Sequence, residues 1–153
     1  MGTPEFALSA LEKLIANGYE ILAVVTAPDK PVNRKQILTP PPVKKIALQY
    51  KIPVLQPEKV SEIKEKISDL KPDLIVVVAY GKIIPKEILE IPKYGSLNIH
   101  PSLLPKYRGP SPIQFAILNN EKITGATIML MDEKMDHGPI LTQEKIKIQP
   151  TET

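Results

Sequence analysis

The chain has 153 residues, of which 42% are hydrophobic and 24% charged, with a formal net charge of +3 and a sequence pI of about 9.0. These values are typical of one globular domain and exclude a disordered or fibrous protein, while the small positive excess permits an anionic partner such as RNA. Because the chain has no cysteine, disulfides, thiolate metal sites and a cysteine nucleophile are excluded as well.

The first half of the chain is predicted to contain three helices and one strand. Apolar residues recur at helical spacing over residues 4–17, 42–50 and 61–70, and Ser61 is a suitable N-cap for the third helix. Residues 20–26 form a nearly continuous β-branched run, which is typical of a strand buried on both faces.

The second half is predicted to contain four strands and one helix. Residues 73–79 form another buried run, and shorter strand patterns cover residues 96–99, 125–130 and 140–148. A helix is expected over residues 112–119, between the second and third of these strands.

This alternation predicts an α/β fold: a doubly wound, mostly parallel sheet with helices on both faces. In such folds ligands bind beyond the carboxyl ends of the strands, so functional residues are expected there. The longest strongly apolar run, residues 74–79, is far below the roughly 20 residues of a membrane-spanning helix, and a cytoplasmic protein is expected.

Two common ligand sites of α/β folds are excluded by the glycine pattern. None of the seven glycines forms a Gly-x-Gly pair, and no Gly-Lys-Ser or Gly-Lys-Thr occurs. The nicotinamide-dinucleotide fingerprint and the phosphate-binding P-loop both need such glycines.

The predicted strand over residues 96–99 leads into a polar segment with candidate catalytic residues. Asn98 and His100 alternate along the strand and therefore share a face at its carboxyl end. A histidine at that place can move a proton near pH 7. The alternative, a histidine that only makes a structural hydrogen bond, stays open on these residues alone.

Two further segments are candidates for the same region. Asp136 lies in a loop that directly follows the predicted strand 125–130, so it can approach His100; a solvated carboxylate is the alternative. Residues 26–42 form a long, proline-rich, basic loop that includes Arg34. Such a loop can hold the phosphates of RNA or be a plain surface loop.

Taken together, these segments resemble the methionyl-tRNA formyltransferase family over nearly the whole chain. The matching segments are Gly2-Thr3-Pro4-Glu5-Phe6-Ala7, residues 26–31, residues 42–44, Val78-Ala79-Tyr80-Gly81, Asn98-Ile99-His100, residues 102–105, Arg108-Gly109, Pro112-Ile113-Gln114, Met131-Asp132 and Asp136.

The resemblance implies a Rossmann-like formyltransferase fold and transfer of a formyl group from 10-formyltetrahydrofolate to the amino group of initiator methionyl-tRNA, without a metal. It assigns residues to three roles: catalysis by Asn98, His100 and Asp136, folate binding by Ser102, Leu103, Leu104 and Pro105, and tRNA binding by Arg34.

The segment from His100 to Pro105 is shared with folate-dependent formyltransferases that act on small amines. It therefore identifies the donor chemistry, and an acceptor such as glycinamide ribonucleotide or an amino sugar stays an alternative. The opening Gly2–Phe6 segment, the triplet Pro112-Ile113-Gln114 and the basic loop favour the tRNA acceptor.

The chain departs from the family pattern at its ends and at three positions. Family members usually have a short central strand before Gly2 and a C-terminal tRNA-binding barrel, so residues 1–153 are expected to be an incomplete catalytic domain. An inactive folate-binding or RNA-binding fragment is the remaining alternative. Asn33 and Lys35 replace the usual glycines beside Arg34, and His137 replaces a usual threonine.

Overall fold

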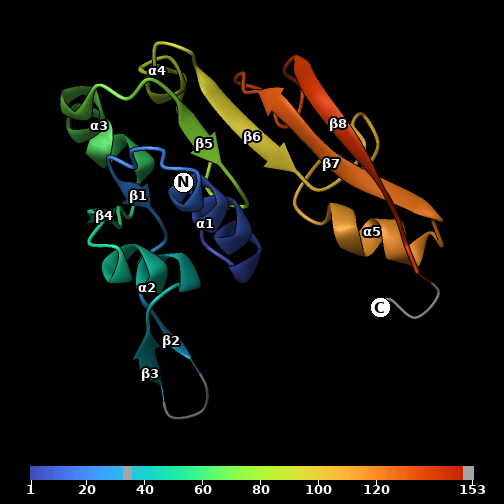
Figure 1. Cartoon of the computed structure of the whole chain (residues 1–153), viewed down its shortest axis with the longest axis horizontal. Coiled ribbons are helices and arrows are strands. Elements are labelled where there is room, and N and C mark those ends of the chain that lie inside the picture. Colours follow the sequence, from blue (N-terminus) through green and yellow to red (C-terminus); the bar gives the residue numbers. More distant parts are fainter. Residues whose placement is uncertain (33–35, 150–153) are drawn as a thin grey trace.

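The strands of the C-terminal half form one four-stranded sheet. A computed structural model of the chain describes residues 1–32 and 36–149. The sheet has the order β5-β6-β7-β8 and runs diagonally across Figure 1. Its members are β5 (Ile75–Val77), β6 (Ser96–His100), β7 (Ile123–Leu130) and β8 (Ile140–Lys147).

Strand directions in this sheet are mixed. β5 and β6 are parallel, as predicted, whereas β6 pairs antiparallel with β7 and β7 pairs antiparallel with β8. The turn over residues 131–139 sends the chain directly back along β7, and such a short connection can only join antiparallel neighbours. The α/β class is confirmed, but the sheet is parallel only in its N-terminal part.

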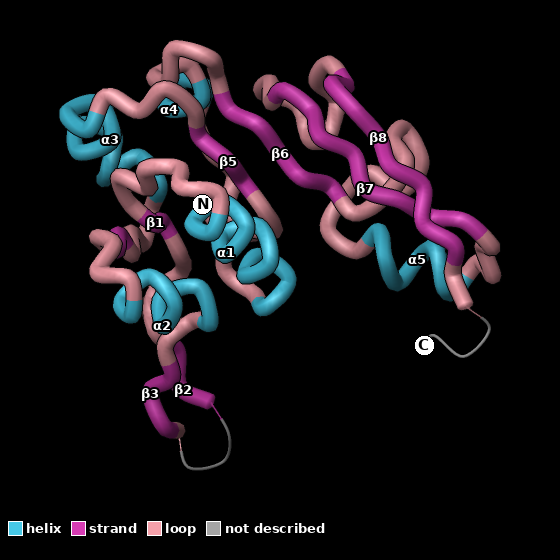
Figure 2. Tube along the Cα trace, in the orientation of Figure 1, coloured by secondary structure: helices cyan, strands magenta, loops and turns pink. Residues whose placement is uncertain are grey.

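Two smaller sheets belong to the N-terminal half. β1 (Val24–Val25) pairs parallel with β4 (Val54–Leu55). β2 (Lys30–Val32) and β3 (Ile37–Thr39) pair antiparallel and form a hairpin that points away from the rest of the molecule (Figures 1 and 2). The sequence predicted only a loop there, because these strands are short and contain a proline.

The predicted strand over residues 20–26 is correct only at Val24 and Val25. Met1 and Gly2 lie between β1 and β5: the Gly2 amide donates to the Val25 carbonyl at 3.0 Å, and the Val78 amide donates to the Met1 carbonyl at 2.9 Å. Beyond them, a groove of about 490 Å³ separates residues 20–24 from residues 73–76. The polypeptide at residues 20–23 thus has no described strand beside it, so it is not a strand.

Helices cover both faces of the strands, as predicted. α1 (Leu8–Ala16) and α2 (Pro42–Gln49) pack on one apolar cluster that contains Val24 and Val78. α3 (Lys64–Leu70) and α4 (Lys86–Leu89) pack on a second cluster with Val25 and Val77. Because neighbouring strand residues point to opposite faces, the two clusters lie on opposite sides of β1 and β5.

The starts of two helices differ slightly from the prediction. The first helix opens with a 3-10 turn, Glu5–Ala7, and α3 follows another, Val60–Ile63. Ser61 is inside this turn and is not the N-cap of α3, whose N-cap position is Ile63. α5 (Pro112–Leu118) precedes β7 and leads into the start of that strand (Figure 1). None of the helices within residues 1–32 and 36–149 has the length and apolarity to cross a bilayer.

Candidate active site

Strand β6 presents Asn98 and His100 at its carboxyl end, where the sequence placed the site. His100 is only 4% exposed, and Asn98 is half-buried. In the antiparallel register Asn98 lies opposite Met129 and His100 opposite Thr127. Residues paired in this way share one face of the sheet, so all four point to the same side.

Asp136, the third predicted catalytic residue, lies next to Asn98 and His100. The Asn98 amide Nδ2 donates to Asp136 Oδ1 at 3.2 Å, and the backbone amide of Gly109 donates to Oδ2 at 2.8 Å. His100 Nδ1 lies 3.6 Å from Oδ1, within reach of a charge interaction but beyond a direct hydrogen bond. The structure therefore brings Asn98, His100 and Asp136 together.

The second nitrogen of His100 fixes which ring atom faces Asp136. Nε2 is 2.9 Å from the carbonyl oxygen of Tyr107. A carbonyl can only accept a hydrogen bond, so Nε2 carries a hydrogen. Nδ1 is thus the nitrogen available to take or give a proton on the Asp136 side.

The loop that carries Asp136 is closed tightly against the end of β7. The Met131 amide donates to the Ser96 carbonyl at 2.7 Å, and the Leu130 amide donates to the Pro139 carbonyl at 2.9 Å. Gly138 makes this closure possible, because a Cβ there would lie 1.9 Å from the Leu130 carbonyl oxygen. Asp136 itself adopts a left-handed conformation, with φ of 48°.

His137 contacts a different carboxylate from the one in the site. Its Nδ1 lies 2.9 Å from Asp132 Oδ2, and the Lys134 amide donates to Asp132 Oδ1 at 2.8 Å. These two hydrogen bonds, the His137 one first, hold the pKa of Asp132 below its usual range. His137 is half exposed, so this contact lies at the protein surface and is separate from the hydrogen bonds that close the loop.

The four residues predicted to contact folate differ in exposure. Ser102 and Leu104 are buried, and Ser102 Oγ donates to the Lys106 carbonyl at 2.6 Å. Leu103 is half-buried and Pro105 exposed. Ser102 and Leu104 therefore hold the segment in place, which leaves the side chains of Leu103 and Pro105 for contact with a ligand.

Thr127 and Gln143 brace this segment, and the sequence did not single them out. Thr127 Oγ1 donates to the Ser102 carbonyl at 2.6 Å and accepts from the Leu104 amide at 3.1 Å. Gln143 Nε2 donates to Thr127 Oγ1 and to the Leu104 carbonyl, both at 2.9 Å. Strand alternation marks Thr127 as a buried position of β7, but only the register shows that it faces His100.

Arg34, the predicted tRNA contact, lies outside the described residues, together with Asn33 and Lys35. The hairpin of β2 and β3 leads into and out of that stretch. Within residues 1–32 and 36–149 there is no group of three or more histidine, aspartate or glutamate side chains arranged to hold a metal ion. The groove between β1 and β5 includes none of the predicted catalytic residues.

Comparisons with known proteins point to one family. The family model described as formyl transferase matches residues 1–153. A methionyl-tRNA formyltransferase of Thermodesulfovibrio yellowstonii is 56% identical over 149 residues, which are 96% of this chain and 48% of that protein. The chain spans about half the length of the curated relatives it matches.

Solved structures give the same fold. The phosphoribosylglycinamide formyltransferase of Bacillus halodurans superimposes with a TM-score of 0.78 and 27% identity, over 99% of this chain and 80% of that one. A sugar 3N-formyl transferase, solved in the presence of dTDP and 5-N-formyl-THF, superimposes with a TM-score of 0.65 and 27% identity, over 96% of this chain and 50% of that one.

Proposed function

This chain belongs to the formyl transferase family, and from that premise we propose that it carries the formyl-transfer site of a methionyl-tRNA formyltransferase. In this proposal residues 1–153 lie in the catalytic domain of a cytoplasmic enzyme. The donor is 10-formyltetrahydrofolate, and the acceptor is the amino group of initiator methionyl-tRNA. The family resemblance seen in the sequence is confirmed; the reaction and its residues are the proposal.

The observation that carries the proposal is the convergence of Asn98, His100 and the Gly109 amide on the Asp136 carboxylate. Formyl transfer needs hydrogen-bond donors for the oxygen that becomes negative and a base for the amine proton. Both kinds of group stand within one hydrogen-bonded cluster here.

The reaction begins when the acceptor amine attacks the formyl carbon. The new carbon–nitrogen bond places negative charge on the formyl oxygen, which Asn98 and a protonated His100 stabilise. Asn98 Nδ2 has two hydrogens; one is given to Asp136 and the other stays available for this oxygen. Each such donor is worth a few kcal/mol in the transition state.

Collapse of the tetrahedral intermediate breaks the bond between the formyl carbon and N10 of the folate. The amine loses one proton and N10 gains one, so the proton balance is neutral. Asp136 accepts the amine proton directly or through water, and protonated His100, whose Nδ1 lies 3.6 Å from Asp136 Oδ1, gives its Nδ1 proton to N10 and is reprotonated by Asp136. No metal is required for any of these steps.

The folate is placed by the braced segment that follows His100. Leu103 and Pro105 offer apolar surface, and the hydrogen bonds from Thr127 and Gln143 hold the backbone of this segment rigid. The sugar 3N-formyl transferase that shares this fold was solved in the presence of 5-N-formyl-THF, which supports a folate as the donor.

The acceptor is assigned from the sequence similarity. At 56% identity the relative in Thermodesulfovibrio yellowstonii is named a methionyl-tRNA formyltransferase, whereas the phosphoribosylglycinamide formyltransferase with a similar fold is 27% identical. A small amine such as glycinamide ribonucleotide is the second candidate acceptor, because the structural similarity to the phosphoribosylglycinamide formyltransferase covers 99% of this chain.

The proposal is tested with the full-length protein and 10-formyltetrahydrofolate. Initiator methionyl-tRNA is expected to be formylated, and glycinamide ribonucleotide to react far more slowly. Asn98→Ala and His100→Ala are each expected to lower kcat about 10²-fold to 10³-fold, since each removes a donor to the developing oxyanion. Preferred use of the small amine, or near-normal turnover by either variant, would overturn the proposal.

The matched control is His137→Thr, which removes the other histidine of the chain. His137 is half exposed and contacts Asp132, so this variant is expected to keep kcat within about threefold, because surface changes have small effects.

A further inference from the structure

Asp29 is held by two side chains at the base of the β2–β3 hairpin. Lys44 Nζ donates to both carboxylate oxygens of Asp29, each at 2.8 Å, and Gln56 Nε2 donates to Oδ1 at 2.7 Å. The side chains of Asp29 and Lys44 are only 23% and 21% exposed. Hydrogen bonds from Gln56 and Lys44 hold the pKa of Asp29 below its usual range.

These three residues tie both ends of the hairpin to the sheet. Asp29 immediately precedes β2, and Lys44 lies in the first turn of α2, which follows β3 after Pro40 and Pro41. Gln56 follows β4, and its Nε2 also donates to the Ala27 carbonyl at 2.8 Å. One cluster thus joins the chain entering the hairpin, the chain leaving it and the small sheet.

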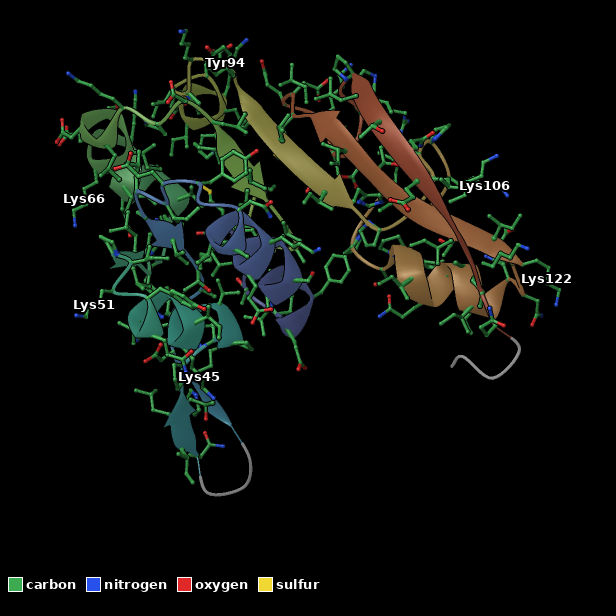
Figure 3. The ribbon with its side chains drawn as sticks, in the orientation of Figure 1. Lys45, Lys51, Lys66, Tyr94, Lys106 and Lys122 are labelled. Carbon is green, nitrogen blue, oxygen red and sulfur yellow. The ribbon has the colours of Figure 1, made fainter. Side chains whose placement is uncertain are left out.

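Beyond this cluster the hairpin projects freely from the molecule (Figures 1 and 2). Ile37 and Leu38 of β3 are 56% and 64% exposed, so apolar packing does little to hold it. Its direction therefore depends on its base. Lys30 and Lys45 are exposed at that base, and Figure 3 shows Lys45 where α2 meets the hairpin; such cations suit the phosphates of a nucleic acid.

We propose that Asp29, Lys44 and Gln56 form a latch that sets the direction of the β2–β3 hairpin and thereby positions it as an arm for the tRNA acceptor. The inference rests on the proposed function for the identity of the acceptor. Asp29 and Lys44 are positioning residues in this account, because they act on the acceptor only through the hairpin and lie on different elements from Asn98, His100 and Asp136.

The test uses the full-length protein with Asp29→Asn and Lys44→Met. Each change removes a charge-assisted hydrogen bond, and the KM for methionyl-tRNA is expected to rise about tenfold. The kcat at saturating tRNA and the KM for 10-formyltetrahydrofolate are expected to stay within about twofold, because the formyl-transfer site is unchanged. The exchanged pair Asp29→Lys with Lys44→Asp is expected to recover most of the lost affinity.

A matched control removes the same charge elsewhere. Lys66→Met on α3 leaves the latch intact (Figure 3) and is expected to change the KM for tRNA less than twofold. A rise as large as that of Lys44→Met would show a general charge effect and overturn the latch.

Hydrogen exchange gives a readout that does not depend on the reaction. Amides of residues 30–32 and 36–39 are expected to exchange at least about tenfold faster in Asp29→Asn than in the unchanged protein, while β6 and β7 are unaltered. Unchanged exchange, or an altered kcat with an unchanged KM for tRNA, would overturn the latch. If the unchanged protein does not formylate methionyl-tRNA, the proposed function fails, and faster exchange without that activity would overturn the assignment of the arm to this acceptor.

Discussion

The sheet of β5 to β8 and the small sheet of β1 and β4 hold their functional parts in different ways. In the larger sheet, Asn98, His100 and Asp136 are fixed by strand pairing, a closed loop and several hydrogen bonds from β6, β7 and β8. Beside the smaller one, the separate β2–β3 hairpin depends on the cluster around Asp29. Under the proposed function, the first region is the site of chemistry and the second is the arm for the acceptor, and reacting atoms need closer positioning than a large substrate does.

Outside the proposed catalytic residues, the largest effect is expected from Gly138→Ala. The new Cβ would lie 1.9 Å from the Leu130 carbonyl oxygen, so the loop must move and Asp136 moves with it. A displacement of about 1 Å can lower a rate about 10²-fold, and a loss of that size in kcat is expected in a steady-state formylation assay.

Gly18→Ala is the control for that change. Gly18 has φ of 74° but open space around its Cβ position, so the variant is expected to lose about 1 kcal/mol of stability and keep its kcat. Equal kcat values for Gly138→Ala and the unchanged protein would contradict a rigidly held site in the larger sheet.

A smaller effect is expected from Thr127→Val, because the valine side chain has nearly the same shape as threonine but no hydroxyl. Loss of the hydroxyl leaves the Ser102 carbonyl and the Leu104 amide without their partner. The free energy of unfolding should fall by about 1–3 kcal/mol, and the KM for 10-formyltetrahydrofolate should rise. Urea unfolding and steady-state kinetics check both, with the exposed Thr142→Val as control. Equal effects of the two variants would contradict the brace.

Hydrogen exchange compares the two sheets without any substitution. β6 lies between two hydrogen-bonded neighbours, whereas β1 pairs over Val24 and Val25 beside an open groove. Amides of β6 and β7 are therefore expected to exchange more slowly than those of Val24 and Thr26, because local stability follows packing and pairing. Uniform protection would mean that the two regions open as one unit.

The smallest effect is a pH dependence of the hairpin. The folded pKa of Asp29 is lowered by Gln56 and Lys44. Its stabilising contribution is therefore complete above the pKa of the unfolded chain, about 3.9, and is lost as the pH falls through the lower folded value. After correction for intrinsic exchange rates, amides of residues 36–39 should lose protection in this acidic range. Asp29→Asn should show no such loss.

Much of this arrangement could be predicted from the order of residues. The β-branched run at residues 73–79 and the alternation of Asn98 with His100 predicted a strand whose polar end faces the crevice. The loop containing Asp136 follows a strand of the same sheet, and the three residues do meet. Local pattern was sufficient because Asn98 and His100 stand near the carboxyl end of their strand and Asp136 lies in the loop that follows a neighbouring strand.

The parts that were missed depend on contacts between distant segments. The pairing of His100 with Thr127 is a matter of register, and two-residue periodicity alone does not fix which strands face each other. The run at residues 20–26 has strand propensity, but no strand of the described part of the chain lies beside its first residues, which stay irregular. The latch joins residues 29, 44 and 56 across three elements, which no local pattern reveals.

The most direct test of the central claim is single-turnover formylation of methionyl-tRNA by the full-length protein with Asp136→Asn. This substitution keeps the shape of the side chain but removes the base and the charge that faces His100. The rate of the chemical step is expected to fall at least about 10²-fold, with the affinities for tRNA and folate changed less than threefold. A rate close to that of the unchanged protein would contradict the assignment of formyl transfer to the cluster of Asn98, His100 and Asp136.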